Sequence, residues 1–565
     1  MMVLAAPAAA APRRLAGEDI LMRAGIVALA ALLLLFIALP LATLLLKSFQ
    51  DSAGHFVGLS NYGRYFATPT LVASVWNSLG VAVLTTAIVV PLAYLYAYGL
   101  TRTCLPGKRL FAALALLPLF APSLLPAISL IYIFGNQGFL KGWLAGGSIY
   151  GPLGIVMAQV FYCFPHALMI LITAFSLADG RLYEAAAAMG TPHRRVFWTV
   201  TLPGVRYGLI SALFVVFTLV ITDFGIAKVI GGQFNVLATD AYKQVVGQQN
   251  FEMGAVVGFL LLAPAVIAFA LDRYVQRRQV ALLSARAVPL APSRNAGRDL
   301  ALMLYCLLVG GTIAAVLVVA VWGSFVTYWP YNLSLTLKNY DFETFEPNAA
   351  GPYFASLRMA TLAAVAGTAV IFAGAYLIEK GRGLRGLRTL AHATAMLPMA
   401  VPGLVLGLGY VFFINARWNP LGVLYGSILL LAINSIAHFY TTAHVTAMTA
   451  LKQLDAEFEA VSASLQVPFY RTFARVTVPI CLPAILDIAI YLFVNALTTV
   501  SAVVFLYGAS SKLASISIVH MDEAGATAAA AAMATLIVAT ALAVKVVHLV
   551  LEQHVFAKLQ AWRQR

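Results

Sequence analysis

Charged residues are scarce in this chain of 565 residues. Asp, Glu, Lys and Arg together make up 10% of it, whereas soluble domains carry about 25%. Apolar residues make up 62%. Such a chain has too little polar surface to face water, which excludes a soluble globular protein. We therefore predict an integral membrane protein of the all-α class, because helices satisfy their own backbone hydrogen bonds in lipid.

Cysteines are also few, and the histidines are not grouped as they are in catalytic or metal sites. The four cysteines lie in or beside apolar runs, without close pairing, so we expect reduced apolar fillers and infer neither a disulfide nor a metal site; they are Cys104, Cys163, Cys306 and Cys481. Four histidines lie in similar places, and the last two are six residues apart, which does not put two ligands on one helix face; they are His166, His392, His438 and His444.

A nucleotide-binding motif is missing. The chain has no Gly-x4-Gly-Lys-Ser/Thr, and the nearest fragment, Gly107-Lys108-Arg109, lacks the hydroxyl and the leading Gly. We therefore expect no enzyme activity and no cofactor bound by this chain. The net charge of +15 comes without interleaved basic and aromatic residues, so we expect no nucleic-acid partner.

Long apolar runs, in contrast, are plentiful. We count about twelve runs of roughly 20 residues, each long enough to cross the hydrocarbon layer. The predicted spans are 24–46, 75–98, 110–134, 152–178, 206–228, 253–271, 299–322, 356–378, 390–414, 423–450, 483–506 and 527–550. The first is expected to remain uncleaved, because its apolar run continues past the length of a signal peptide without a small-residue cleavage site.

One polar stretch between spans occurs twice. The first copy runs from Glu184 through Gly190 to Pro203, and the second from Glu459 through Gln466 to Pro479. Each combines a helix-prone segment, a break and a later Pro, which predicts a short surface helix followed by a new membrane helix. We call residues 184–203 the first loop and residues 459–479 the second loop.

The two loops resemble the EAA loop of permease subunits in binding-protein-dependent ABC importers. The resemblance implies a cytoplasmic helix that docks on an ATPase, hence two ATPase copies that use ATP and Mg, and a periplasmic substrate-binding protein. It implies ATPase-coupling roles for Glu184, Ala185, Ala186, Gly190, Pro203, Glu459, Ala460, Gln466 and Pro479. In the second loop Gln466 replaces the expected Gly, and Glu459 lies seven residues before it instead of six. Because a non-Gly residue in a left-handed turn costs about 1 kcal/mol, we expect that loop to turn differently or to dock less tightly.

The rest of the chain is duplicated as well. Ser48, Asn61-Tyr62 and Ser78 are matched by Ser324, Asn339-Tyr340 and Ser356. Offsets between 276 (Pro203 to Pro479) and 280 (Pro122 to Pro402) predict one six-helix unit written twice in the same orientation. We predict two tandem type I importer permease units, at 1–271 and 299–565, joined by a cytoplasmic linker at 272–298.

Basic residues indicate the orientation. If both loops face one side, that side collects the termini, the linker and most Lys and Arg, which predicts that it is the cytoplasm. The exceptions are Lys47, Arg64, Lys141, Lys228, Lys243, Lys338, Arg358, Arg417 and Lys512. We expect a multi-pass protein of the bacterial inner membrane with both termini cytoplasmic.

Two features are candidates for the translocation path. Prolines interrupt a span in each unit, at 118, 122 and 126 and at 398 and 402, and produce either path-lining kinks or plain packing kinks. Asp223 is a rare acidic residue of a membrane helix, predicted roughly 30 Å beyond Pro203 and so near the periplasmic end. It is expected either to contact substrate or the outer gate, or to be a hydrogen-bonded helix-end Asp. The remaining candidates are Thr222, Thr498, Thr499 and Ser501.

Two segments bear on the substrate. Residues 222–232 and 495–507 resemble fused permeases assigned to 2-aminoethylphosphonate uptake, which implies import of that small polar solute from periplasm to cytoplasm. Fused ferric-iron permeases are similar in layout, but they usually show Lys-Glu-Leu-Pro where this chain has Leu497-Thr498-Thr499-Val500. Ferric iron is the alternative.

Two other classes of function compete with the importer. A secondary transporter driven by an ion gradient would be built from repeats too, but it calls for central carboxylates, of which there are few, and leaves two EAA-like loops unexplained. A membrane scaffold without transport is the third class.

Overall fold

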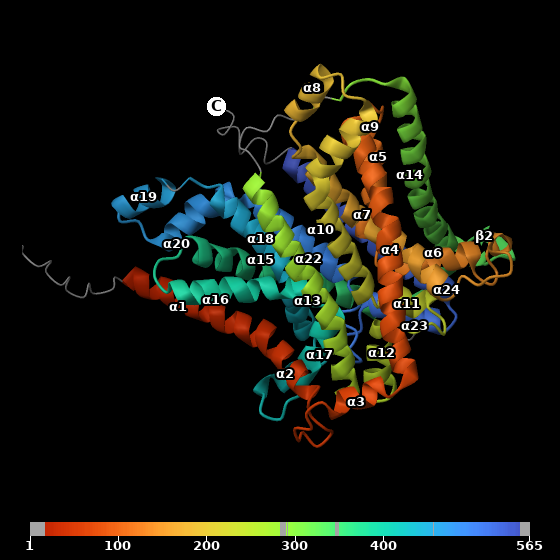
Figure 1. The fold of residues 1–565 in the computed structure, drawn as a ribbon. Coiled ribbons are helices and arrows are strands. Elements are labelled where there is room, and N and C mark those ends of the chain that lie inside the picture. Colours follow the sequence, from red (N-terminus) through yellow and green to blue (C-terminus); the bar gives the residue numbers. More distant parts are fainter. Residues whose placement is uncertain (1–16, 283–289, 291, 345–349, 456, 554–565) are drawn as a thin grey trace, which may run out of the picture.

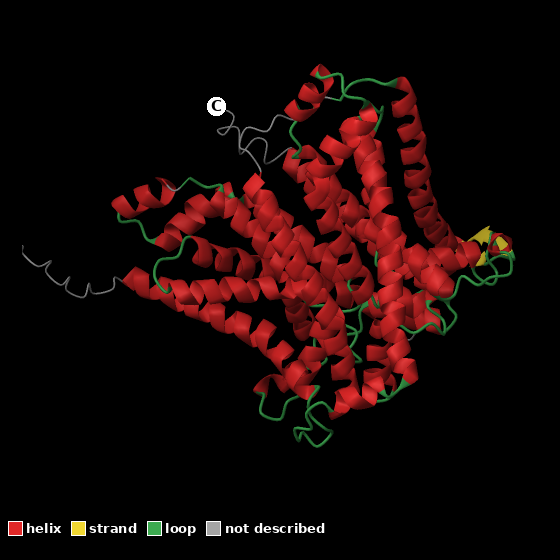
Figure 2. Cartoon of the chain, in the orientation of Figure 1, coloured by secondary structure: helices red, strands yellow, loops and turns green. Residues whose placement is uncertain are grey.

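The computed structural model describes residues 17–282, 290, 292–344, 350–455 and 457–553. Helices make up most of this part of the chain (Figure 2). Its one sheet is a small antiparallel hairpin of β1 (Val326–Tyr328) and β2 (Asn332–Leu335). The all-α prediction is confirmed. Both termini and Arg286 of the predicted linker lie outside the described residues.

Nine helical runs within the described residues are long and apolar enough to cross a membrane. They are α1 to α2 (Gly17–Lys47), α4 (Pro69–Arg102), α7 (Pro152–Ser176), α9 to α10 (Arg194–Thr222), α13 (Phe251–Leu282), α14 (Ala296–Phe325), α15 (Ala350–Glu379), α18 (Ile428–Lys452) and α24 (Thr527–Leu551). Three bent pairs bring the number to 12 if each is one span. The predicted number of about twelve is therefore the upper end of what the structure shows.

The bent pairs correct the prediction of single kinked helices at 110–134 and 390–414. The first pair is α5 (Lys108–Leu116) with α6 (Leu124–Phe134), bent by 103°, and the second is α16 (Arg385–Met396) with α17 (Gly403–Ile414), bent by 118°. Ala121 and Val401, each directly before a Pro, are extended, because the Pro ring disfavours the helical region for the residue before it. The prolines thus break these helices.

Two further predicted spans end early. Helix α10 (Leu202–Thr222) stops before Asp223, and α22 (Leu482–Thr498) stops before Thr499. The short helix α11 (Gly225–Ile230) follows the first stop, whereas turns follow the second. The third bent pair joins residues 469–480 to α22 at 77°. The other short helices are α3 (Ser60–Phe66), α8 (Arg181–Ala188), α9 (His193–Val196), α12 (Leu237–Tyr242), α19 (Glu457–Ser464), α20 (Phe469–Thr472), α21 (Val478–Ile480) and α23 (Ala514–Glu523).

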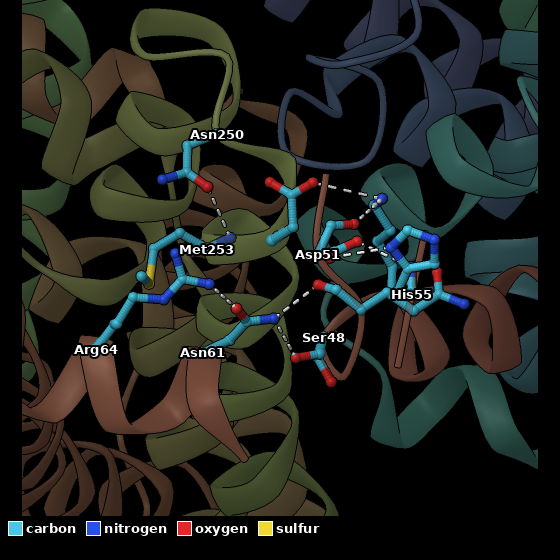
Figure 3. A network of polar contacts seen from close by, with 10 residues as sticks. Ser48, Asp51, His55, Asn61, Arg64, Asn250 and Met253 are labelled. Carbon is cyan, nitrogen blue, oxygen red and sulfur yellow. Dashed lines mark hydrogen bonds and ion pairs between the residues drawn. The ribbon is translucent and has the colours of Figure 1, made fainter. Parts of the chain in front are cut away.

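The sequence repeat recurs as a repeat of hydrogen bonds. After α2, the Asn61 amide donates to the carbonyls of Ser48 (2.9 Å) and Gln50 (2.8 Å), and the Ser48 hydroxyl pairs with Tyr62 at 2.9 Å. Figure 3 shows the bonds of the Asn61 side chain, with Ser48 and Arg64 beside it and Asp51 and His55 nearby. After α14 the same bonds form at the predicted partners: Asn339 donates to Ser324 (3.0 Å) and Val326 (2.8 Å), and Ser324 pairs with Tyr340 at 2.8 Å.

A second repeated bond ties the long helices to short ones. The hydroxyl of Ser78 on α4 accepts the backbone N–H of Leu237, the first residue of α12, at 2.8 Å. The hydroxyl of Ser356 on α15 accepts the N–H of Ala514, the first residue of α23, also at 2.8 Å. Both bonds are buried. Two serines matched by sequence alone thus perform the same structural task.

The first helix of each repeat packs on the other repeat. In Figure 1 α1 runs beside α16 at the left, and α14 stands beside α4 and α5. Tyr410 on α17 donates to the carbonyl of Phe36 at 2.6 Å, and Tyr305 on α14 donates to the carbonyl of Leu92 at 2.7 Å. Each repeat therefore completes its surface with a helix from the other.

Candidate functional site

The first loop begins with helix α8. Glu184 lies in its first turn, Ala185 is exposed and Ala186 is buried. The chain then turns at Gly190, whose φ is +65°, and the N–H of Thr191 bonds back to the carbonyl of Ala186 at 3.0 Å. A bond of this kind across a left-handed residue is how many helices end.

The second loop makes the same turn without glycine. Gln466 has φ +54°, and the N–H of Val467 bonds back to the carbonyl of Ser462 at 2.9 Å. The expectation that this loop turns differently is therefore wrong. The left-handed Gln466 costs about 1 kcal/mol of backbone strain. The hydrogen bond that closes α19 is retained and offsets this cost.

The turn fixes the alignment of the two loops. Gly190 aligns with Gln466 and Thr191 with Val467, which is an offset of 276. The same offset aligns Glu184 with Ala460 and Tyr183 with Glu459. The two glutamates are therefore not equivalent. Glu184 is exposed on α8, whereas Glu459 takes the half-buried position of Tyr183.

The prediction that a new membrane helix begins at Pro203 and at Pro479 is wrong in detail. Residues 193–222 form one helical run that includes a π-helical turn at Phe197–Thr201, directly before Pro203. In the second loop a matching π-helical turn lies at Phe473–Thr477, Pro479 lies in α21, and the membrane helix starts at Leu482. A widened turn before a Pro is expected because Pro cannot donate a backbone hydrogen bond.

Both loops expose apolar side chains. Leu182, Met189 and Trp198 are exposed around α8, and Phe458, Val461 and Leu465 around α19. The second set lines a groove together with Arg471 and Arg475. The two helices project from separate places on the molecule (Figure 1). Exposed apolar clusters with charged rims are typical of surfaces that bind another protein.

The second candidate site lies where α10 ends. The Asp223 carboxylate accepts the side-chain amide of Gln159, on α7, at 3.0 Å and the N–H of Ile226, in α11, at 2.9 Å. Within the described part of the chain, Asp223 makes no ion pair. It is half-buried. The carboxylate is thus a hydrogen-bonded group at a helix end that has no cation to balance its charge.

The matching place in the second repeat carries no acid. Thr499 follows the end of α22 as Asp223 follows the end of α10, and its carbonyl accepts the Ser515 hydroxyl at 2.7 Å. Thr222 and Thr498 donate their hydroxyls to carbonyls within their own helices, at 2.8 and 2.9 Å. Of the other predicted path residues, Ser501 has its hydroxyl near Gly403, at the second proline break.

A serine and a glycine meet at each break, and their positions are interchanged between the two repeats. A methyl group built on Gly225 would come within 2.6 Å of Ser123 Oγ, at the start of α6. At the equivalent place in the other repeat, a methyl group on Gly403 would come within 2.9 Å of Ser501 Oγ and 3.1 Å of His438 Nε2. Each break therefore places one serine hydroxyl against one glycine.

Gln159 and His438 are residues of this site that no sequence motif predicted. Gln159 was detectable as a polar residue within an apolar span. His438 was treated as a packing residue, and His444 pairs with His392 (3.1 Å). No group of three or more His, Cys, Asp or Glu arranged to hold a metal occurs among the described residues.

Comparison with known proteins shows a similarity to transport permeases. Residues 90–280, which include the first loop, match the family of binding-protein-dependent transport system inner membrane components. A putative ferric transport system permease of Haemophilus influenzae is 24% identical over 515 residues, covering 87% of this chain and 78% of that protein. The ferric transport system permease of Actinobacillus pleuropneumoniae is 24% identical over 531 residues, covering 91% and 76%.

A shorter relative aligns with part of the chain. A homologue of the spermidine/putrescine permease from Mycoplasma genitalium is 25% identical over 223 residues, covering 39% of this chain and 75% of that protein. The long relatives and the short one are thus all transport permeases. This chain is therefore similar, over residues 90–280, to the inner-membrane components of binding-protein-dependent transport systems, and over most of its length to long transport permeases.

Proposed function

We propose that this chain supplies both permease units of an ATP-driven importer that carries 2-aminoethylphosphonate from periplasm to cytoplasm. Its two loops face the cytoplasm and each binds one copy of an ATPase, which uses ATP and Mg. A periplasmic binding protein delivers the substrate on the opposite side. The observation that carries the proposal is the pair of loops with the same turn, the same π-helical turn and an exposed apolar cluster each.

The substrate assignment is supported by the chemistry at the helix break. 2-Aminoethylphosphonate carries an ammonium group and an anionic phosphonate group. Asp223 is a half-buried carboxylate without a cationic partner among the described residues, so an ammonium group would gain a charge-assisted hydrogen bond there. The segments that resemble 2-aminoethylphosphonate permeases, 222–232 and 495–507, contain Asp223 and Ser501.

Ferric iron is the second candidate substrate. The two long relatives bear the name of ferric transport permeases. Against it, Asp223 belongs to no group of three or more His, Cys, Asp or Glu side chains placed to hold a metal ion among the described residues.

Transport in vesicles tests the proposal. The chain is reconstituted with its ATPase and binding protein, and accumulation of labelled 2-aminoethylphosphonate and of labelled ferric iron is measured with ATP. We expect accumulation of the phosphonate alone. Uptake of iron alone would favour the alternative, and calorimetry of each substrate on the binding protein provides an independent measurement.

The same vesicles separate the classes of transporter. An ATPase variant that cannot hydrolyse ATP is expected to abolish uptake. Uptake that survives on a proton gradient would show a secondary transporter. ATP hydrolysis that is never stimulated by the loaded binding protein would show a scaffold.

Asp223→Asn tests the helix break. The amide keeps the shape but removes the charge, so we expect uptake to fall at least tenfold while the loaded binding protein still stimulates ATP hydrolysis. Asp487→Asn is the matched control, because Asp487 is an acid on a membrane helix that contacts His548 (3.4 Å) away from the breaks. Normal uptake by the Asp223 variant would remove this residue from the path.

A further inference from the structure

A basic residue lies at the end of the second long helix in each repeat. Arg102 is the last residue of α4, and Lys380 follows directly on α15. Their offset of 278 equals that of Ser78 and Ser356, which lie on the same two helices and make the same bond. The two basic residues are therefore equivalent.

In the first repeat the basic residue, Arg102, contacts helix α8. The Arg102 guanidinium lies 5.1 Å from the ring centre of Tyr183 and 5.5 Å from that of Phe175, and it donates to the carbonyl of Phe175 at 2.7 Å. Arg102 is 5% exposed. Tyr183 also donates its hydroxyl to Thr201 Oγ1 at 3.2 Å. A buried guanidinium over an aromatic face is a stabilising contact.

In the second repeat the equivalent residue holds helix α19. Lys380 Nζ lies 3.2 Å from Glu459 Oε2, and the two side chains are 14% and 23% exposed. Glu459 occupies the position of Tyr183, as the common turn shows. The chemistry differs between the repeats, a cation over a ring in one and an ion pair in the other, but the connected positions are the same.

We propose that these two contacts are tethers that transmit movement of each loop helix to the long helix of its own repeat. The inference rests on the proposed coupling of the loops to an ATPase. Helix α4 packs against α7 and α10, and α15 packs against α18 and α22. Gln159 lies on α7 and His438 on α18, and α10 and α22 end directly before Asp223 and Thr499, so a pull on either long helix reaches a helix break. Arg102, Tyr183, Lys380 and Glu459 are positioning residues that act through the helices.

The second tether offers a charge exchange as a test. Lys380→Glu and Glu459→Lys each place two like charges together, and the double variant restores an ion pair with reversed sign. In vesicles with ATPase and binding protein, we expect each single variant to lower the substrate imported per ATP hydrolysed by fivefold or more. The double variant is expected to return to within about twofold of the parent chain.

The first tether is tested through the aromatic ring. Tyr183→Phe keeps the ring beneath Arg102 and is expected to couple normally, whereas Tyr183→Ala removes it and lowers import per ATP. Salt separates the two tethers, because an ion pair is screened more than a buried cation over a ring. Raising the ionic strength is therefore expected to weaken coupling in Tyr183→Ala, which relies on the second tether, more than in Lys380→Glu.

The possible outcomes are distinguishable. Normal coupling in both Lys380→Glu and Glu459→Lys, or singles that fail and a double variant that fails equally at normal membrane amounts, overturns the proposal. Failure of the proposed function would appear in the parent chain, as an absence of ATPase binding or of import, before any variant is compared.

Discussion

At the scale of residues, two left-handed turns define the loops. Gly190 is the residue type that such a turn favours, and its presence in the repeat predicted the turn correctly. Gln466 makes the same turn at a backbone cost of about 1 kcal/mol. The sequence alone could not show this, because the residue type Gln does not indicate a positive φ. Only the backbone hydrogen bond across the turn reveals it.

Gly190→Asp is predicted to uncouple import from ATP hydrolysis. A Cβ added at Gly190 meets nothing within 4 Å, and the left-handed backbone adds only about 1 kcal/mol of strain, so the protein is expected to insert normally. The new charge, however, lies beside the exposed Met189 on the surface proposed to bind the ATPase. Import into vesicles is expected to fall at least tenfold, measured together with the amount of protein in the membrane.

Gly107→Asp is the matched control. Gly107 also has a positive φ (+69°) and no atom within 4 Å of an added Cβ, but it lies outside both loops. Normal import by this control and by Gly190→Asp alike would contradict the docking role of the first loop.

At the scale of elements, serine hydroxyls anchor short helices to long ones. Ser356→Ala leaves the buried N–H of Ala514 without a partner, which costs about 1–3 kcal/mol. We predict a lower thermal unfolding midpoint in detergent. Ser78→Ala is expected to lower it by a similar amount, because it breaks the equivalent bond to Leu237.

The control for this pair is Thr389→Ala. Its hydroxyl makes only an exposed bond to its own helix, at Arg385. Equal midpoints for Ser356→Ala, Ser78→Ala and this control would show that the two anchors carry no stability.

Most helices could be predicted from apolar runs, but their breaks could not. Hydropathy does not register whether a Pro bends a helix or divides it, so the 103° and 118° breaks were read as kinks. Nor does it register the end of α10, since Phe224 and Ile226 after the break are as apolar as the helix before it. The motifs Asn61-Tyr62 and Asn339-Tyr340, in contrast, were recognised because their bonds are local. Gln159 with Asp223 and Arg102 with Tyr183 join distant residues, and no local pattern marks them.

At the scale of the whole molecule, exchange of the first helices joins the repeats. Helix α1 and helix α14 each pack on the other repeat, with backbone carbonyls of Phe36 and Leu92 bound by tyrosines across the boundary. The linker therefore adds little to the association of the two halves.

A chain divided between residues 282 and 292 is predicted to assemble from its two co-expressed halves. An affinity tag on one half is expected to recover the other in mild detergent, because separation would expose the packed faces of α1 and α14. The control is a first half co-expressed with a second half that lacks α14, for which recovery is expected to fall severalfold. Halves that separate freely would contradict the role of the exchanged helices.

The asymmetry between Asp223 and Thr499 at equivalent helix ends has a consequence for ancestry. A permease assembled from two identical subunits must place an acid on both sides of its axis or on neither. Here the position equivalent to Asp223 is Thr499, and Ser123 with Gly225 in the first repeat corresponds to Gly403 with Ser501 in the second. Once one gene encodes both units, the sequence of each unit can change independently of the other. The two helix breaks together can then carry an odd number of charges.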